Sequence, residues 1–182
     1  MSVTSYVPIF IHENFPDMNA KQIGTILSAW QFSFAFWPIP LGILLHKIGR
    51  KNALIFGVIL ACIATVLYAL FSYVKDPTLF FWMNFVARFI EGIADATLVV
   101  SLSAIIAIEF PDNTEKYFGI MHFALAAGMT LGPIICAPLY TMMGYDGAFY
   151  FLTGVIGVVG LIGAIFVVPS RINDSLKSHE LD

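Results

Sequence analysis

The chain has 182 residues, of which 59% are hydrophobic and only 12% are charged, and its formal net charge is −3. Soluble domains carry about 25% charged residues, so this composition argues against a solvent-facing globular domain. Lysine and arginine are scattered along the chain, so the sequence predicts no nucleic-acid-binding surface. We therefore expect the lipid bilayer to surround most of the chain.

Five long apolar runs produce this composition, and together they contain only three of the charged residues. Each run reaches or exceeds the roughly 20 residues that a helix needs to cross a hydrocarbon layer. The runs lack the alternating pattern of barrel strands, and only helices or closed barrels satisfy the backbone in lipid. The sequence therefore predicts an all-α, polytopic membrane helix bundle over residues 1–170. Its full helices are expected at about 22–45, 52–74, 78–108, 117–141 and 147–169.

The two ends of the chain differ from these runs. Residues 1–12 are too short to span a membrane and lack the basic region of a secretory signal, so we expect them to be the end of a truncated first helix. Residues 171–182 are polar and are expected to form a cytoplasmic tail.

Short connections between the runs make neighbouring helices antiparallel, so the loops alternate between the two sides of the membrane. If the loop at 46–51 is cytoplasmic, most basic residues lie inside, as the positive-inside rule requires. An integral protein of either the plasma membrane or an intracellular vesicle membrane fits this arrangement. The residues then expected inside are Lys47, Arg50, Lys51, Lys116, Arg171 and Lys177, against Lys21 and Lys75 outside.

The three charged residues inside a run all belong to the third one. At 100° per residue, Asn84, Arg88, Glu91 and Asp95 share an arc of roughly 60° on one helix face. Exposing three such charges to lipid opposes insertion by roughly 8–10 kcal/mol. We therefore expect this polar stripe to face protein or water.

Two interpretations of the polar stripe remain open. Arg88 and Glu91 are three residues apart and can form a salt bridge that only neutralises the helix for insertion. That pair leaves one negative charge over, and Asp95 is then the better candidate for a group that exchanges a proton or binds a solute. Gln31 in the first run is a further candidate for lining such a cavity.

Other polar residues carry weaker signals. Ser28 and Ser33 either line the same cavity or bond to their own helix backbone, and His122 is either a proton relay or an interfacial residue. Cys62 and Cys136 have no metal-ligand spacing and are read as packing residues. We find no nucleophile with a base, no phosphate loop and no metal triplet, so the sequence predicts neither an enzyme nor a cofactor.

Three segments resemble motifs of the major facilitator superfamily. Between the first two runs, Gly42, Gly49, Arg50 and Lys51 match its cytoplasmic loop motif, with His46 where an acid is usual. The stretch 87–96 is similar to the fourth-helix motif, in which an arginine precedes a polar residue and glycine. The segment with Gly128, Gly132 and Pro133 resembles the Gly-x-x-x-Gly-Pro antiporter motif of the fifth helix, with Cys136 and Ala137 in place of two glycines.

This resemblance implies a fold and an activity. The five runs correspond to helices two to six of the amino-terminal bundle, and a second six-helix half or a partner subunit completes the transporter. The vesicular amine and polyamine transporter-like group and the drug:proton antiporters are the nearest in character, which implies exchange of a small cationic organic solute for protons. In that fold the 42–51 motif forms an inner gate, and Gly128, Gly132 and Pro133 let the fifth helix bend and pack closely. The alternatives are a non-transporting scaffold subunit of a larger complex and an intramembrane enzyme, the latter resting only on Glu91 and Asp95.

Overall fold

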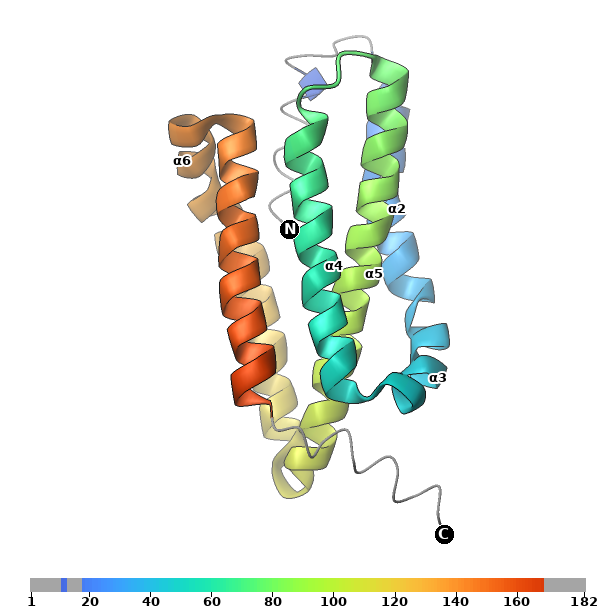
Figure 1. Ribbon diagram of the computed structural model, residues 1–182, viewed down its shortest axis with the longest axis vertical. Coiled ribbons are helices and arrows are strands. Elements are labelled where there is room, and N and C mark those ends of the chain that lie inside the picture. Colours follow the sequence, from blue (N-terminus) through green and yellow to red (C-terminus); the bar gives the residue numbers. More distant parts are fainter. Residues whose placement is uncertain (1–10, 13–17, 169–182) are drawn as a thin grey trace.

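The structure is a computed structural model that describes residues 11–12 and 18–168, with the side chains of Cys136 and Val167 excepted. Most of residues 1–12, predicted to end a first helix, and the polar tail predicted at 171–182 lie outside the described residues. Every regular element within them is helical, which confirms the all-α prediction (Figure 1). In chain order the elements are α2 (Ala20–Phe36), α3 (Pro38–Ile48), α4 (Arg50–Phe71), α5 (Pro77–Glu109), η1 (Pro111–Asn113), α6 (Thr114–Ile162) and η2 (Gly163–Val167).

The helices have the length and hydropathy of membrane spans. Within the described residues, α4, α5 and two stretches of α6 are each long and apolar enough to cross a bilayer. The pair α2 and α3 passes the same test when both are taken as one bent span, which makes up to five. The chain is therefore a multi-pass integral membrane protein.

The helix predicted over residues 22–45 is broken near its middle. Trp37 separates α2 from α3, and the two helix axes differ by 52°. Pro38 is the first residue of α3, where it supplies no backbone N–H to the preceding turn. The bend therefore follows from the sequence, since proline is the commonest cause of a sharp kink.

A single glycine joins α3 to α4. Gly49 has φ 89°, in the region that favours glycine because side chains with a Cβ are strained there. The predicted loop at 46–51 is thus largely helical, with the reversal of direction made at one residue. Lys47 lies in the last turn of α3 and Lys51 in the first turn of α4.

The long helix α5 lies at the centre of the packing and contacts α2 and α4. Asp76 begins it by accepting hydrogen bonds from the backbone N–H groups of Thr78 and Leu79, at 2.8 and 3.3 Å. Pro77 follows at the first helical position, where its missing N–H costs nothing. The polar stripe predicted from the sequence lies on this central helix.

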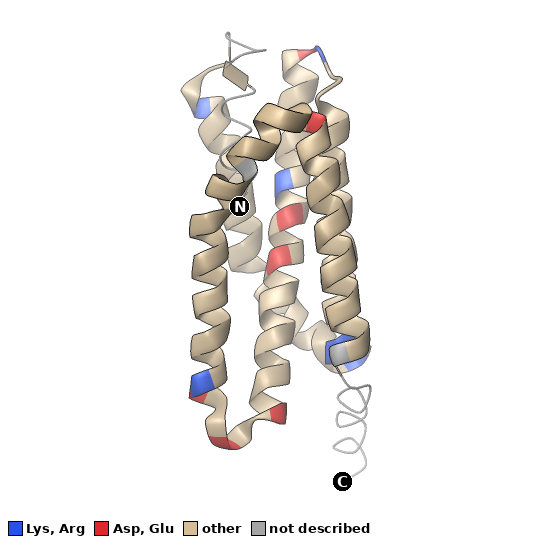
Figure 2. Cartoon of the chain, turned by 90° about the vertical axis from the view of Figure 1, so that its left-hand side faces the viewer, with Lys and Arg blue, Asp and Glu red and all other residues tan. Residues whose placement is uncertain are grey.

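The helix α6 has two arms that run in opposite directions. Gly144, with φ 72°, makes the reversal between residues 114–143 and residues 145–162. Figure 2 shows the chain passing from the first arm to the second at the upper end of the molecule. The second arm packs on α4, where a Cβ at Gly160 would lie 2.9 Å from Val58 and one at Gly157 would lie 3.5 Å from Cys62.

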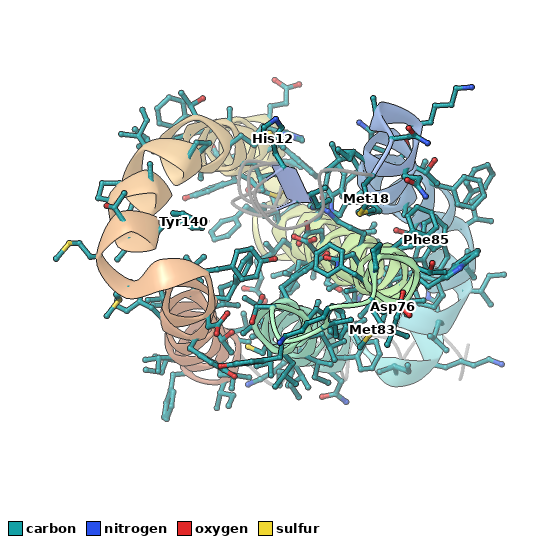
Figure 3. All side chains as sticks on the ribbon, turned by 90° about the horizontal axis from the view of Figure 1, so that it is seen from above. His12, Met18, Asp76, Met83, Phe85 and Tyr140 are labelled. Carbon is teal, nitrogen blue, oxygen red and sulfur yellow. The ribbon has the colours of Figure 1, made fainter. Side chains whose placement is uncertain are left out.

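Two clusters of buried side chains lie above and below the middle of α5. The larger cluster includes Ile26, Tyr68, Phe80 and Phe149, and the smaller one contains Leu54, Ile105 and Ala164. Tyr140, labelled in Figure 3, reaches from α6 to pack against the larger cluster.

The predicted loops fall at the two ends of the bundle. The α3–α4 junction and the start of α6 share the lower end in Figure 1, and the start of α2 and the α4–α5 connection share the upper end. Helices that alternate in this way place the 46–51 and 109–116 loops on one side of the membrane.

Candidate functional site

The three charged residues of the polar stripe lie near the middle of α5, where Figure 2 shows one blue and two red segments. Asn84 is fully buried, and the side chains of Arg88 and Glu91 are 2% and 13% exposed. Asp95 is partly buried one turn further along. The stripe therefore faces other helices, as the cost of exposing charge to lipid requires.

Among the described residues, Arg88 and Tyr68 both donate to Glu91. Its Oε2 lies 2.9 Å from Nη1 of Arg88 and 3.0 Å from the hydroxyl of Tyr68 on α4, which donates to it. The salt bridge expected between residues 88 and 91 is thus present, with an additional partner from the neighbouring helix. A carboxylate that accepts from a guanidinium and a phenol has its negative charge compensated locally.

Asp95 has a different environment. Its Oδ2 accepts a hydrogen bond of 2.9 Å from the indole N–H of Trp30 on α2. The same carboxylate lines a cavity of about 340 Å³ between α2, α5 and the first arm of α6. The acid that the sequence leaves without a basic partner is therefore the one that borders an open space.

The remaining walls of this cavity are mostly apolar. Trp30 and Phe34 contribute an aromatic pair with ring centroids 5.1 Å apart and planes at 22°. Gly128 and Met129 on α6 form part of the opposite wall. A cavity with apolar walls and a single carboxylate is the usual form of a site for an organic solute that carries a polar or charged group.

Of the five candidate residues on α2 and α5, Asp95 alone lines this cavity, because Arg88 and Glu91 pair with each other and two more residues lie apart from it. Gln31 is exposed, although its neighbour Trp30 lines the cavity. Asn84 donates its Nδ2 to the carbonyl of Phe80 on its own helix, at 2.9 Å.

The residues of the predicted gate loop are spread over a helix junction. Gly42, in α3, has no neighbour within 4 Å of its Cβ position, and His46 is exposed. Arg50 begins α4 and is partly buried. Lys51 donates from Nζ to the carbonyl of Ile165 in η2, at 2.9 Å, so the start of α4 is joined to the end of the α6 region.

The predicted antiporter motif lies on the first arm of α6. Gly128 borders the cavity, but neither Gly128 nor Gly132 has any described neighbour within 4 Å of its Cβ position. Pro133 is accommodated inside the helix without non-helical backbone angles at that residue. The close packing expected of this motif is therefore not formed within the described part of the chain.

Two functional candidates were missed from the sequence. Trp30 is not among the residues singled out from the sequence, yet its indole donates a hydrogen bond to Asp95. Phe34 is not among them either, yet it lines the cavity. A usable signal was present, since residues 30, 33 and 37 recur on one face of α2, and Ser33 at their centre is buried.

The weaker candidates have local roles. Ser28 and Ser33 bond to carbonyls of their own helix, and His122 is exposed and stacks on Phe118. Cys62 is a partly buried free thiol. The described residues contain no cluster of three groups able to hold a metal ion.

A bundle of membrane-spanning helices with an acid at the wall of a central cavity is the architecture of a membrane transport protein. The sequence profile of the Major Facilitator Superfamily matches residues 1–181, so the chain belongs to this family of transporters. The family resemblance noted in its loop and helix motifs is confirmed, and the family's members are transporters, not enzymes.

Three individual relatives are similar to the chain at 26–32% identity. The chain is 26% identical to the mouse MFS-type transporter SLC18B1 over 153 residues, which cover 84% of this chain and 33% of that protein. It is 29% identical over 150 residues to a putative inorganic phosphate cotransporter of Drosophila ananassae, covering 81% of this chain and 30% of the relative. It is 32% identical over 127 residues to the class H tetracycline resistance protein of Pasteurella multocida, covering 69% of this chain and 29% of the relative.

The chain spans about a third of the length of the curated relatives that it matches. No solved structure matches the chain significantly.

Proposed function

We propose that the chain is part of a proton-coupled antiporter that moves a small cationic organic solute across a membrane. Asp95 is the group that binds either a proton or the solute, and a second six-helix half or a partner subunit completes the translocation path. The observation that carries this proposal is the Asp95 carboxylate at the wall of an apolar cavity of about 340 Å³.

The division of labour between the two acids supports this assignment. Glu91 shares its Oε2 between Arg88 and Tyr68, so its charge is already compensated. Asp95 accepts from the neutral indole of Trp30, which leaves its charge available to a mobile cation. Either a proton or an ammonium group compensates that charge, and the two occupants exclude each other, which is the basis of exchange.

The negative charge that Asp95 places at the cavity wall also bears on which class of solute is bound. A relative described as a putative inorganic phosphate cotransporter and a relative described as a tetracycline resistance protein both align with this chain. A carboxylate repels phosphate inside a low-dielectric cavity, and the nearby guanidinium of Arg88 is engaged with Glu91. These observations favour an organic cation over an inorganic anion.

Binding of tetraphenylphosphonium, a lipophilic organic cation, tests the proposal on the chain in lipid nanodiscs. We expect Asp95→Asn to weaken binding at least tenfold, because it removes the only acid among the described residues that line the cavity. Proton release on binding, measured in weak buffer, is expected to approach one proton per bound cation at a pH where Asp95 is protonated.

Asp112→Asn is the matched control, since Asp112 is an exposed acid in η1 that does not line the cavity. It is expected to leave binding unchanged. Equal binding by the Asp95→Asn and unmodified chains would contradict the transport role of Asp95 and favour a scaffold subunit.

A further inference from the structure

The helix α2 is attached to α5 by two indole side chains, one on each side of a close backbone contact. Trp30 donates from Nε1 to Asp95 and Trp37 donates from Nε1 to the hydroxyl of Thr97, both at 2.9 Å. The two bonds have the same length and donor type but differ in their acceptors. One acceptor is an ionisable carboxylate and the other is a neutral hydroxyl.

Between the two indoles, the backbones of α2 and α5 come close together. A Cβ added at Gly92 would lie 2.5 Å from the carbonyl oxygen of Trp30 and would also overlap Ser33. The buried hydroxyl of Ser33 is satisfied within its own helix by the carbonyls of Ala29 and Trp30, at 3.1 Å. The turn that carries Trp30 is therefore seated directly on α5, one turn from Asp95.

We propose that Trp30 is the positioning residue of the Asp95 site, holding the ionised carboxylate at the cavity wall and transmitting its neutralisation to α2. A hydrogen bond to an ionised acceptor is roughly twice as strong as one between neutral groups. Uptake of a proton, or pairing with a cation, therefore weakens the Trp30 bond and leaves the Trp37 bond as it was. This role rests on the proposed exchange function of Asp95.

Because Trp30 lines the cavity, its ring borders the space that a bound cation would occupy. Its ring is part of the cavity wall and stacks on Phe34, which lines the same space. A cation that approaches the carboxylate thus also meets the face or edge of this aromatic pair. The bend between α2 and α3 lies two turns further on, at Trp37, where the second indole holds the helix to α5.

Among the described residues, few groups around Asp95 are able to respond to pH. On its own helix these are Glu91 and Arg88, which pair with each other, and on α4 the nearest is Tyr68, which donates to Glu91. The residues that α2 and α6 contribute to the cavity lining carry no ionisable side chain. A pH response of Trp30 that depends on residue 95 therefore reports on that carboxylate.

The test uses tryptophan fluorescence of the chain in lipid nanodiscs, with protons as the probe. The chain has three tryptophans, so Trp37→Phe combined with Trp82→Phe leaves Trp30 as the sole indole. Protonation of Asp95 is followed in parallel by its infrared carboxyl band, assigned as the band that Asp95→Asn removes. We expect the Trp30 emission maximum to shift with the same midpoint as this band, and the shift to be lost in Asp95→Asn.

The matched control is the chain with Trp30→Phe and Trp82→Phe, in which Trp37 is the sole indole and its acceptor is the hydroxyl of Thr97. Its emission is expected to stay constant through the Asp95 transition. A constant Trp30 emission while the Asp95 band titrates would reject the positioning role and leave the proposed function standing. A Trp37 shift at the same midpoint would also reject it, since the change would then be global. Absence of any Asp95 band that titrates would overturn proton exchange at Asp95, and the positioning role with it.

Discussion

The hydroxyl of Tyr68 on α4 lies 3.0 Å from Oε2 of Glu91 on α5, the oxygen that also receives Nη1 of Arg88 at 2.9 Å. Tyr68 is fully buried and packs against Phe149 of α6, with ring centroids 5.5 Å apart. The Tyr68 side chain of α4 therefore contacts both α5 and α6, and its hydroxyl helps to compensate the charge of Glu91. This arrangement distinguishes Glu91 from Asp95, which has an open cavity on one side.

Tyr68→Phe is expected to destabilise the chain by about 1–2 kcal/mol, because the partly buried carboxylate of Glu91 loses the hydrogen bond from the phenol while the ring packing is kept. Thermal unfolding in bicelles measures the change. Tyr150→Phe, at a tyrosine of α6 that is 46% exposed, is the matched control and is expected to unfold like the unmodified chain. Equal stability of both variants would show that the hydrogen bond to Glu91 contributes nothing.

Gly92→Ala is expected to cost about 1–3 kcal/mol, because the new methyl group would overlap Ser33 and the Trp30 carbonyl and would push α2 from α5. The same unfolding assay applies. Gly24→Ala is the control, since nothing lies within 4 Å of its Cβ position, and alanine is there neutral or slightly stabilising. A Gly92→Ala chain as stable as the control would refute the close contact of α2 with α5.

Gly49→Ala is expected to destabilise the junction of α3 and α4 by about 1–3 kcal/mol, because its φ of 89° is strained for any residue with a Cβ. Limited proteolysis near residue 49, together with the unfolding midpoint, reports the effect. Gly42→Ala in α3 is the control, because that glycine has helical neighbours and open space around it. Should both substitutions behave alike, the backbone conformation at Gly49 would not be as described.

Lys51→Gln is expected to loosen the end of the α6 region, since Lys51 donates to the carbonyl of Ile165 across the bundle. Hydrogen exchange of the amides at 163–167 should become several-fold faster, with little change in α5. Lys47→Gln removes an exposed charge from the last turn of α3 and serves as the control. Unchanged exchange in the Lys51→Gln chain would show that this contact does not restrain η2.

The sequence predicted the helices well because the signal for each is local. A run such as that ending near Val74 is long and apolar, and lipid permits only a helix there. The bend at Trp37 was less visible, although Pro38 marks it. The angle of 52° between α2 and α3 cannot be derived from this segment alone and comes from the tertiary structure.

In the candidate site, too, some features follow from local sequence and others only from helix packing. Helical periodicity placed Arg88, Glu91 and Asp95 on one face, and their spacing predicted the salt bridge that the structure contains. Gln31 was chosen for its polarity, but it is exposed, whereas the neighbouring Trp30 faces the cavity. Because glutamine is polar, the sequence favoured residue 31 as part of the cavity wall. The rotation of α2 about its own axis, which only the tertiary structure shows, places residue 30 in the wall instead.

By itself, the sequence determined that this protein is a membrane helix bundle with a polar stripe on one of its helices, because composition and periodicity act within each segment. Its motifs added the resemblance to the Major Facilitator Superfamily, which the family profile confirms. The tertiary structure decided that Glu91 is compensated by Tyr68 and Arg88, and that Asp95 meets Trp30 at a cavity. The physical reason is that periodicity defines which residues share a helix face but not what lies opposite that face. Contacts between residues 65 positions apart, such as Trp30 and Asp95, arise only when the helices pack.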